Sequence, residues 1–207
     1  MKLKILLIGE DLWKAWMNNL ISHYLIYKLD EMMLKDIYGT HTEFISGKVG
    51  KNVDSKTQQT EVNLIARDSK IKFINDPILI QNLFSTVKFL NLQGNWKYEL
   101  TQLEDLQYTV YDVDQYYNWH TDSNFLFTPT IRKLSFSIGL NDPSEYEGGE
   151  LDIEIHGPNI KGKRFETIVL EKNEMVCFRS NLWHRVRPIT KGVRKSLVGW
   201  VRGPQFV

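Results

Sequence analysis

The sequence predicts a mainly β protein, a jelly roll of short strands with helices in its N-terminal part. After residue 100, eight β-rich runs follow one another, and turn sequences such as Asn141-Asp142-Pro143 and Gly148-Gly149 separate many of them. Evenly spaced short strands of this kind are typical of a sandwich or barrel and not of β-α-β units. The predicted strands are 106–111, 115–120, 131–140, 150–155, 165–171, 175–179, 184–188 and 194–202.

The first hundred residues follow a different pattern. Apolar residues recur at helical spacing over residues 12–34, which predicts a helix with one buried face. Asp76 as N-cap and Pro77 at the first helical position predict the start of a second helix, which Gly94 ends. Between these helices, residues 39–75 are polar and rich in turn formers, and a short alternating run at 62–66 predicts one strand.

The chain of 207 residues is long enough for one domain with a substantial core. We expect residues 1–99 to form a helical buttress and a substrate-side segment of this domain, and residues 100–207 to form its β core. The formal net charge of +1 provides no overall field for nucleic acid or an anionic membrane, so neither is expected as a partner. The sequence sets no oligomeric state.

Cysteine usage and the first residues bear on the compartment. Cys177 is the only cysteine, which excludes an intrachain disulfide and a cysteine-based zinc site and suits a reducing interior. The apolar run near Met1 is short, and Glu10 and Asp11 follow where a signal peptide would have its cleavage site. We therefore expect a cytoplasmic protein.

Three residues at predicted strand ends form a candidate metal site. His120 and Asp122 lie two residues apart, so they share one side of an extended strand end, and His184 follows 62 residues after Asp122. Two histidines and one carboxylate on one face, with three positions left open, are the ligands of non-haem Fe(II) oxygenases. The same three residues could also hold catalytic zinc.

Arg194 favours iron over zinc. It lies ten residues beyond His184, and its planar guanidinium can bind the carboxylate of a co-substrate. A hydrolytic zinc site needs no such anchor. A non-catalytic jelly-roll binding module remains the alternative from another class, and a cupin-like metalloenzyme that uses no 2-oxoglutarate is a second one.

The second half of the chain resembles the Fe(II)- and 2-oxoglutarate-dependent dioxygenases, in the prolyl-4-hydroxylase-like branch. The resemblance covers about residues 100–205 and is carried by the Tyr-x-x-His-x-Asp segment at 117–122, by the central strands and hairpin at 132–151, and by the run at 184–194. That last run reads His-Arg-Val-Arg-Pro-Ile-Thr-Lys-Gly-Val-Arg, with Ile189 where the family has Val.

This resemblance implies a double-stranded β-helix of the cupin-like type and an iron- and 2-oxoglutarate-dependent hydroxylase. It implies Fe(II) on His120, Asp122 and His184 as the catalytic residues, with O2 as oxidant and ascorbate as an optional further ligand. Arg194 and Ser196 would bind the distal carboxylate of 2-oxoglutarate. Tyr111 lies at the position of a tyrosine that contacts 2-oxoglutarate in relatives, and Trp200 matches an aromatic wall of that pocket.

The substrate stays open at this level. A prolyl residue in a peptide or protein is the first expectation from the family, and a free amino acid or other small metabolite is the alternative. Residues 124–129 contain Phe125, Leu126 and Phe127, which could close over a substrate as a lid or pack on the barrel rim. Gly139 stands where some prolyl hydroxylases carry a second tyrosine to the co-substrate, so we expect the floor of the pocket to be built differently.

Overall fold

The structure is a computed structural model of the chain, and it describes residues 23–34, 44–47, 66–123, 129–156 and 162–205. Two antiparallel sheets face each other. The larger sheet has eight strands in the order β1-β12-β8-β15-β6-β4-β2, with β5 pairing on β15, and the smaller has the order β11-β10-β13-β7-β3. A third pair, β14 and β9, lies beside them. This arrangement confirms the predicted jelly roll.

The elements have the following bounds. The helices are α2 Glu31–Leu34, α3 Pro77–Gln93 and the short 3-10 helix η2 Pro143–Glu145. The strands of the larger sheet are β1 Tyr24–Lys28, β2 Ile45–Ser46, β4 Lys70–Ile74, β5 Gln102–Leu103, β6 Leu106–Tyr111, β8 Thr130–Gly139, β12 Glu174–Arg179 and β15 Arg194–Pro204. Those of the smaller sheets are β3 Arg67–Asp68, β7 Tyr116–His120, β9 Tyr146–Gly148, β10 Leu151–Glu154, β11 Phe165–Ile168, β13 His184–Val186 and β14 Ile189–Gly192.

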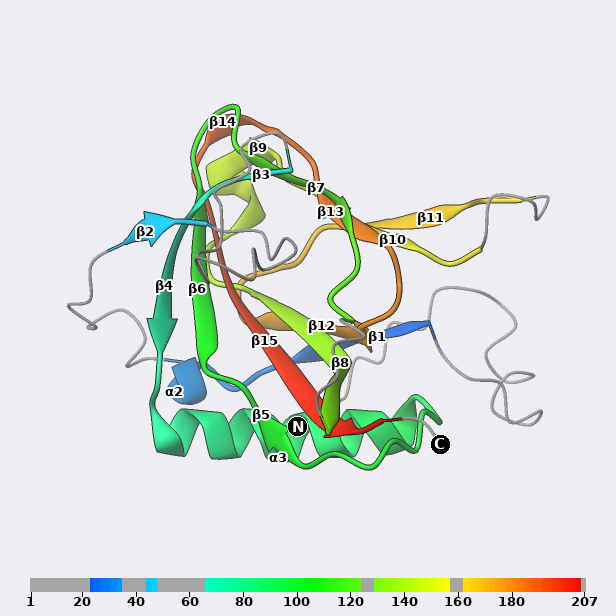
Figure 1. Cartoon of the computed structure of the whole chain (residues 1–207). Coiled ribbons are helices and arrows are strands. Elements are labelled where there is room, and N and C mark those ends of the chain that lie inside the picture. Colours follow the sequence, from blue (N-terminus) through cyan, green and yellow to red (C-terminus); the bar gives the residue numbers. More distant parts are fainter. Residues whose placement is uncertain (1–22, 35–43, 48–65, 124–128, 157–161, 206–207) are drawn as a thin grey trace, which may run out of the picture.

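Helix α3 packs on the larger sheet, as predicted. Figure 1 shows it below that sheet, while β7, β13 and β10 of the smaller sheet lie above. Asp76 caps the helix by accepting a hydrogen bond from the Leu79 backbone N–H, Pro77 opens it and Gly94 ends it. Its apolar face joins one core cluster with the underside of the sheet; fully buried members include Leu83, Val87, Leu106, Leu134, Phe136, Ile138 and Leu197.

All eight strands predicted after residue 100 are present, with bounds that differ by a few residues. Alternation along these strands divides their side chains between two environments. In β8, Phe136 and Ile138 face the helix, while Ser135 and Ser137 face the smaller sheet, where they are also buried. The larger sheet therefore has an apolar face for packing and a polar face that looks into the barrel.

The helix predicted over residues 12–34 is wrong where the structure describes it. Residues 24–28 form β1, which pairs with β12 from Tyr24↔Phe178 to Lys28↔Glu174, and only α2 is helical. Leu25 is buried toward the helix side and Ile26 packs toward the other core, so the strand is covered on both faces. A run that is apolar throughout cannot be assigned to strand or helix by periodicity. Residues 12–22 lie outside the described part.

The polar stretch 39–75 contains strands that we did not predict. β4 pairs with β6 from Lys70↔Val110 to Ile74↔Leu106, and β3 pairs with β7 in the other sheet. The chain thus crosses from one sheet to the other at Ser69 and closes one side of the barrel. The predicted strand at 62–66 lies outside the described residues except for Ala66, which is in a turn.

Within the described residues, no helix is long and apolar enough to cross a membrane.

Candidate functional site

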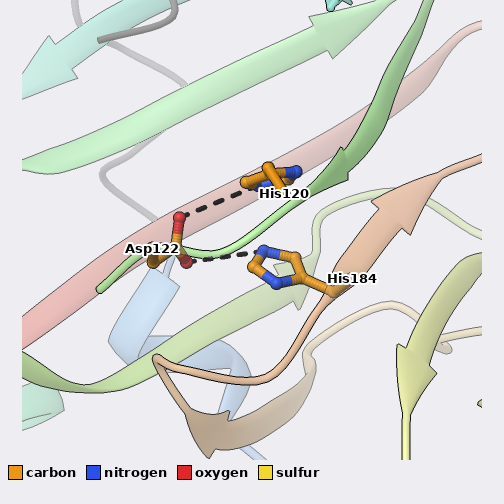
Figure 2. A group of neighbouring side chains, drawn as sticks. All are labelled: His120, Asp122 and His184. Atoms are coloured by element: carbon orange, nitrogen blue, oxygen red, sulfur yellow. Dashed lines mark ion pairs between the residues drawn. The ribbon is translucent and has the colours of Figure 1, made fainter. Parts of the chain in front are cut away.

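The two sheet strands β7 and β13 bring the predicted metal ligands together. They pair antiparallel with His184 directly opposite His120, and Asp122 follows two residues after β7 ends. Figure 2 shows the two imidazoles and the carboxylate pointing toward one another. Asp122 Oδ1 lies 3.7 Å from His120 Nε2, and its Oδ2 lies 3.4 Å from His184 Nε2.

The backbone fixes how both imidazoles are turned. His120 Nδ1 lies 2.8 Å from the carbonyl oxygen of Asn118, and His184 Nδ1 lies 3.0 Å from that of Leu182. Each Nδ1–H can therefore donate to a carbonyl two residues earlier, which leaves the Nε2 lone pair directed at the centre of the group. Metal-ligating histidines are commonly oriented in this way by their second nitrogen.

Asp122 is held as a buried carboxylate. Its backbone N–H donates to the Ser180 carbonyl oxygen at 2.9 Å, and its side chain is 8% exposed. Burial would raise the pKa of Asp122, but the neighbouring His184 and His120 rings, the Arg132 guanidinium and a hydrogen bond from Ser135 hold it below the usual value. The group is therefore an anion at neutral pH.

His120 is held as a neutral imidazole. Its ring stacks on Tyr117, with centroids 3.5 Å apart and an interplanar angle of 12°. Burial, together with the neighbouring His184, lowers the pKa of His120 to about 3. A neutral ring keeps its lone pair free to bind a metal.

These three residues fit a divalent metal. One ligand atom from each lies within 4.8 Å of the others, and no second group of this kind occurs among the residues whose positions are described. The Asp122 oxygens lie close enough to both imidazole nitrogens for one divalent cation to bind between the three side chains. With two nitrogens and one oxygen as donors, the site has the ligand set of a facial triad with open positions.

The triad lies at a cavity between the two sheets. The cavity measures about 460 Å3, counted out to its open mouth. All seven residues predicted to form the site line it: Tyr111, His120, Asp122, His184, Arg194, Ser196 and Trp200. Spacing and the family resemblance together therefore named side chains on or beside β6, β7, β13 and β15 that the fold brings to one place.

Arg194 is a buried cation inside this cavity. It is 4% exposed, its Nη1 donates to Ser196 Oγ at 3.1 Å, and its guanidinium lies 5.7 Å from the ring centroid of Tyr111. No carboxylate in the described part of the chain lies within ion-pairing distance of it. Because an isolated buried charge is costly, this guanidinium is suited to an anionic ligand.

Glycine at position 149 makes room for the Arg194 stem. Gly149 has φ +69°, and a Cβ there would come within 2.8 Å of Arg194 Cδ and 2.3 Å of Ile189 Cδ1. Any side chain would therefore displace the arginine as well as strain the backbone. The Gly-Gly hairpin is part of the arginine site and not only a turn.

Trp200 has an unpartnered donor. Its indole Nε1 is buried and has no hydrogen-bond partner among the described residues, and the Arg132 guanidinium stacks on the ring at 4.1 Å. Trp200 pairs with Ser135 on β8, whereas Arg194 pairs with Tyr111 on β6. The tryptophan is six residues from the arginine along β15, so the two line different parts of the cavity.

Position 139, where some prolyl hydroxylases carry a tyrosine, has no room for a side chain in this structure. A Cβ at this position would come within 2.7 Å of the Glu171 carbonyl oxygen and 3.2 Å of Leu170 Cβ. The segment around Leu170 thus fills the space that a side chain on residue 139 would take. The loop 124–128, considered above as a lid, lies outside the described residues.

Four polar or charged cavity residues were not predicted: Arg67, Gln107, Tyr117 and Ser137. Gln107 shares the face of Tyr111 on β6 by period two, and its Nε2 donates to Thr109 Oγ1 at 2.9 Å. The alternation of β6 and β8 could have indicated Gln107 and Ser137, and Tyr117 belongs to the Tyr-x-x-His-x-Asp segment. Arg67 comes from a two-residue strand and had no sequence signal.

Comparison with known proteins finds a family resemblance over the second half of the chain. The model of the 2OG-Fe(II) oxygenase superfamily matches residues 106–202, the stretch that contributes all seven predicted site residues. This stretch resembles the members of that superfamily. Its resemblance to the prolyl-4-hydroxylase-like branch is confirmed, and Fe(II) and 2-oxoglutarate are the cofactor and co-substrate that the family and the His-Asp-His group indicate.

Curated proteins similar to this chain include PKHD-type hydroxylases. It is 29% identical over 170 residues to one from Gloeothece citriformis, which covers 77% of the chain and 67% of the relative. It is 36% identical over 92 residues to one from Idiomarina loihiensis, covering 44% and 39%. The chain thus spans between two fifths and two thirds of the length of these relatives.

Solved structures share the fold of this chain at low sequence identity. A Pseudomonas putida prolyl-4-hydroxylase has a TM-score of 0.60 at 18% identity, covering 93% of this chain and 100% of that one. A Trichoplax adhaerens prolyl hydroxylase, solved with a peptide fragment of hypoxia inducible factor, has a TM-score of 0.62 at 18% identity, covering 93% and 94%. The double-stranded β-helix expected from the sequence is confirmed.

Proposed function

We propose that this oxygenase hydroxylates an amino-acid-type substrate, with His120, Asp122 and His184 as its iron ligands and Arg194 as the anchor of 2-oxoglutarate. The observation that carries the proposal is their meeting at one cavity: a compact His-Asp-His group and a buried guanidinium that has no carboxylate partner in the described residues. A metal and a dianion satisfy both features at once. Neither a binding module nor a hydrolytic zinc site requires both a His-Asp-His group and a buried guanidinium.

The chain's own residues orient the reactants. The Asn118 and Leu182 carbonyls fix the imidazoles, and Asp122 provides the negative charge on a facial triad. Arg194 binds the distal carboxylate of 2-oxoglutarate by a charge-assisted, bidentate contact, and Ser196, which accepts a hydrogen bond from Arg194, has its own O–H free to donate. Tyr111 forms the wall beside them.

The remaining chemistry belongs to the bound iron and 2-oxoglutarate, which with O2 supply decarboxylation to succinate and CO2 coupled to insertion of one oxygen atom into a substrate C–H bond. The protein supplies orientation and dry surroundings. Burial of His184 and Arg194, at 6% and 4% exposed, keeps water away from the reacting groups.

For the substrate, we propose a proline in a peptide first and a free amino acid or related metabolite as the alternative. The prolyl hydroxylases among the structural neighbours support the first class, including the Trichoplax adhaerens enzyme solved with a peptide fragment.

Anaerobic titration tests the proposal. Purified protein is titrated with Fe(II) and 2-oxoglutarate while the weak visible metal-to-ligand charge-transfer band is recorded. We expect a band that requires both components, that His120→Ala abolishes and that His156→Ala, a control histidine outside the cavity, retains. Absence of the band in the parent protein, or its survival in His120→Ala, would contradict the assignment.

A further inference from the structure

A second buried guanidinium faces the cavity from the N-terminal part of the chain. Arg67, on β3, is 3% exposed and lines the cavity together with His120 and Asp122. It pairs across the strands with Tyr117 of β7, whose ring in turn stacks on His120. Arg67 therefore lies one strand away from the metal site and comes from a different sheet than Arg194.

The surroundings of Arg67 form a fitted cradle. Its Nε donates to Ser69 Oγ at 2.8 Å, and its Cζ lies 4.7 Å from the centroid of the Tyr117 ring. Gly47 packs against the guanidinium, because a Cβ there would come within 2.7 Å of Arg67 Nε and 2.3 Å of Ser69 Oγ. The orientation of the group is thus set before any ligand arrives, which lowers the entropy lost on binding.

The cradle contains no anion. One neutral hydroxyl and one aromatic face contact the guanidinium, and none of the ion pairs found across the described ranges involves Arg67. A buried charge without a counter-ion is costly to maintain. The cavity therefore holds two such cations, and 2-oxoglutarate bound at Arg194 accounts for only one of them.

We propose that Arg67 binds a carboxylate of the primary substrate and so selects carboxylate-bearing substrates. The inference rests on the proposed function, since it assumes that Arg194 takes the co-substrate. A carboxylate matches the planar fork of the guanidinium, with two parallel N–H···O bonds. Anchoring the substrate one strand from His120 brings a neighbouring C–H bond to the metal. The carboxylate belongs either to a free or C-terminal amino acid or to an acidic side chain beside the reacting residue.

A purely structural role would make a different prediction. Arg185 also stacks on a β7 aromatic, 4.8 Å from the centroid of Trp119, but on the outer face and with its Nε donating to Asp152 at 2.8 Å. If Arg67 only supported Tyr117 and His120, its loss would weaken the Fe(II)–2-oxoglutarate complex itself. If it binds substrate, the loss would appear as a change in which substrate analogues bind.

Matched acids and amides test the inference. The parent protein, loaded anaerobically with Fe(II) and 2-oxoglutarate, is titrated with L-proline and L-prolinamide, with acetyl-Gly-Pro and its C-terminal amide, and with acetyl-Glu-Pro-Gly-amide and its Gln counterpart. The perturbation of the visible band gives each Kd. We expect at least one acid to bind about tenfold or more tightly than its amide, and the first two pairs distinguish a free or terminal carboxylate from the acidic side chain of the third.

Two variants then assign that preference. Arg67→Gln should reduce the ratio of amide to acid Kd to about twofold or less, while Arg185→Gln keeps the parent ratio. The inference is overturned if no acid is preferred by the parent protein or if Arg67→Gln keeps the preference. It is also overturned if Arg67→Gln weakens Fe(II) and 2-oxoglutarate binding as much as acid binding. Absence of the visible band in the parent protein would instead refute the proposed function.

Discussion

Two groups of arginines in this protein differ in their partners: one lies away from the cavity and the other lines it. On the outside, Arg185 and Arg187 both donate to Asp152, and elsewhere Arg132 and Arg202 both donate to Glu104. Inside the cavity, Arg67 and Arg194 each donate a hydrogen bond to a serine and lie over a tyrosine ring. Neither has a carboxylate partner among the described residues. The fold supplies anions for these four outer arginines and leaves Arg67 and Arg194 in the cavity for ligands.

The two faces of the larger sheet repeat this division. The face toward α3 is apolar, with Leu134, Phe136 and Ile138 of β8 fully buried in one cluster. The face toward the cavity carries Ser135 and Ser137 on the same strand. Packing stability comes largely from the first face, so substitutions on the second can change ligand binding with little effect on folding.

Among substitutions that test the contrast between the cavity and the outer face, Asp122→Asn should have the largest effect on Fe(II) affinity and turnover. The substitution keeps the shape of the side chain but removes the negative charge from the metal site. Because changes to the groups that merely orient metal ligands already cost about 10- to 100-fold, loss of a ligand charge should lower Fe(II) affinity and turnover by more than about 100-fold. Metal titration and initial rates of succinate formation measure both.

Asp152→Asn is the matched control. Asp152 is also a buried aspartate of the smaller sheet, but its partners are Arg185, Arg187 and Thr167 and it does not line the cavity. Turnover per folded molecule should stay within about twofold of the parent. If Asp122→Asn had the same turnover rate as Asp152→Asn, the proposed functional difference between the cavity and the outer face would be wrong.

A smaller effect is expected for Arg194→Lys. Lysine keeps the charge but presents a point donor instead of a planar fork, so the paired hydrogen bonds to a carboxylate are lost. We expect the KM for 2-oxoglutarate to rise about 10- to 100-fold, corresponding to roughly 1.4–2.8 kcal/mol, with kcat changed much less. Initial rates across a range of 2-oxoglutarate concentrations separate the two constants.

Arg187→Lys provides the comparison for that variant. Arg187 donates to Asp152 from the outer face, so the same substitution there should leave the KM for 2-oxoglutarate unchanged. An unchanged KM in Arg194→Lys would remove Arg194 from the anchor role and leave the buried guanidinium without a ligand.

The sequence predicted the second half of the chain well because its constraints are local. Short strands between turn residues give the order of the β-helix, and period two places His120 and Asp122 on one side of a strand end. The spacing of His184 and Arg194 then follows from the family pattern. Each of these features can be seen within a window of about ten residues. Tertiary contacts were therefore not needed to find these features.

Two features that we did not predict from the sequence, strand β1 and the buried Arg67, depend on tertiary contacts that no local sequence pattern indicates. Residues 24–28 are apolar on both sides, and only the pairing with β12 makes them a strand. Arg67 lies in a two-residue strand within a polar stretch, and its burial comes from Gly47, Ser69 and Tyr117, which are distant or unremarkable in sequence. A buried arginine in such a position looks like any surface arginine until the fold is known.

The smallest predicted effect concerns stability on the outer face. Burial would raise the pKa of Asp152, but hydrogen bonds from Arg187, Arg185 and Thr167 outweigh it and hold that pKa below its usual value. Breaking a buried ion pair costs several kcal/mol, and the two arginines are 32% and 35% exposed, so water compensates part of the loss. We expect Asp152→Asn to lower the free energy of unfolding by about 1–3 kcal/mol at pH 7.

The pH dependence of that difference identifies its cause. A carboxylate whose pKa is depressed in the folded state stabilises the fold above the unfolded pKa of about 3.9, and this contribution is lost as pH falls through the folded value. Urea unfolding of parent and Asp152→Asn should therefore give a constant difference between about pH 5 and 7 and a shrinking one below about pH 4. A difference that persists unchanged in acid would mean that Asp152 acts by packing and not by charge, and that its arginines need no anion.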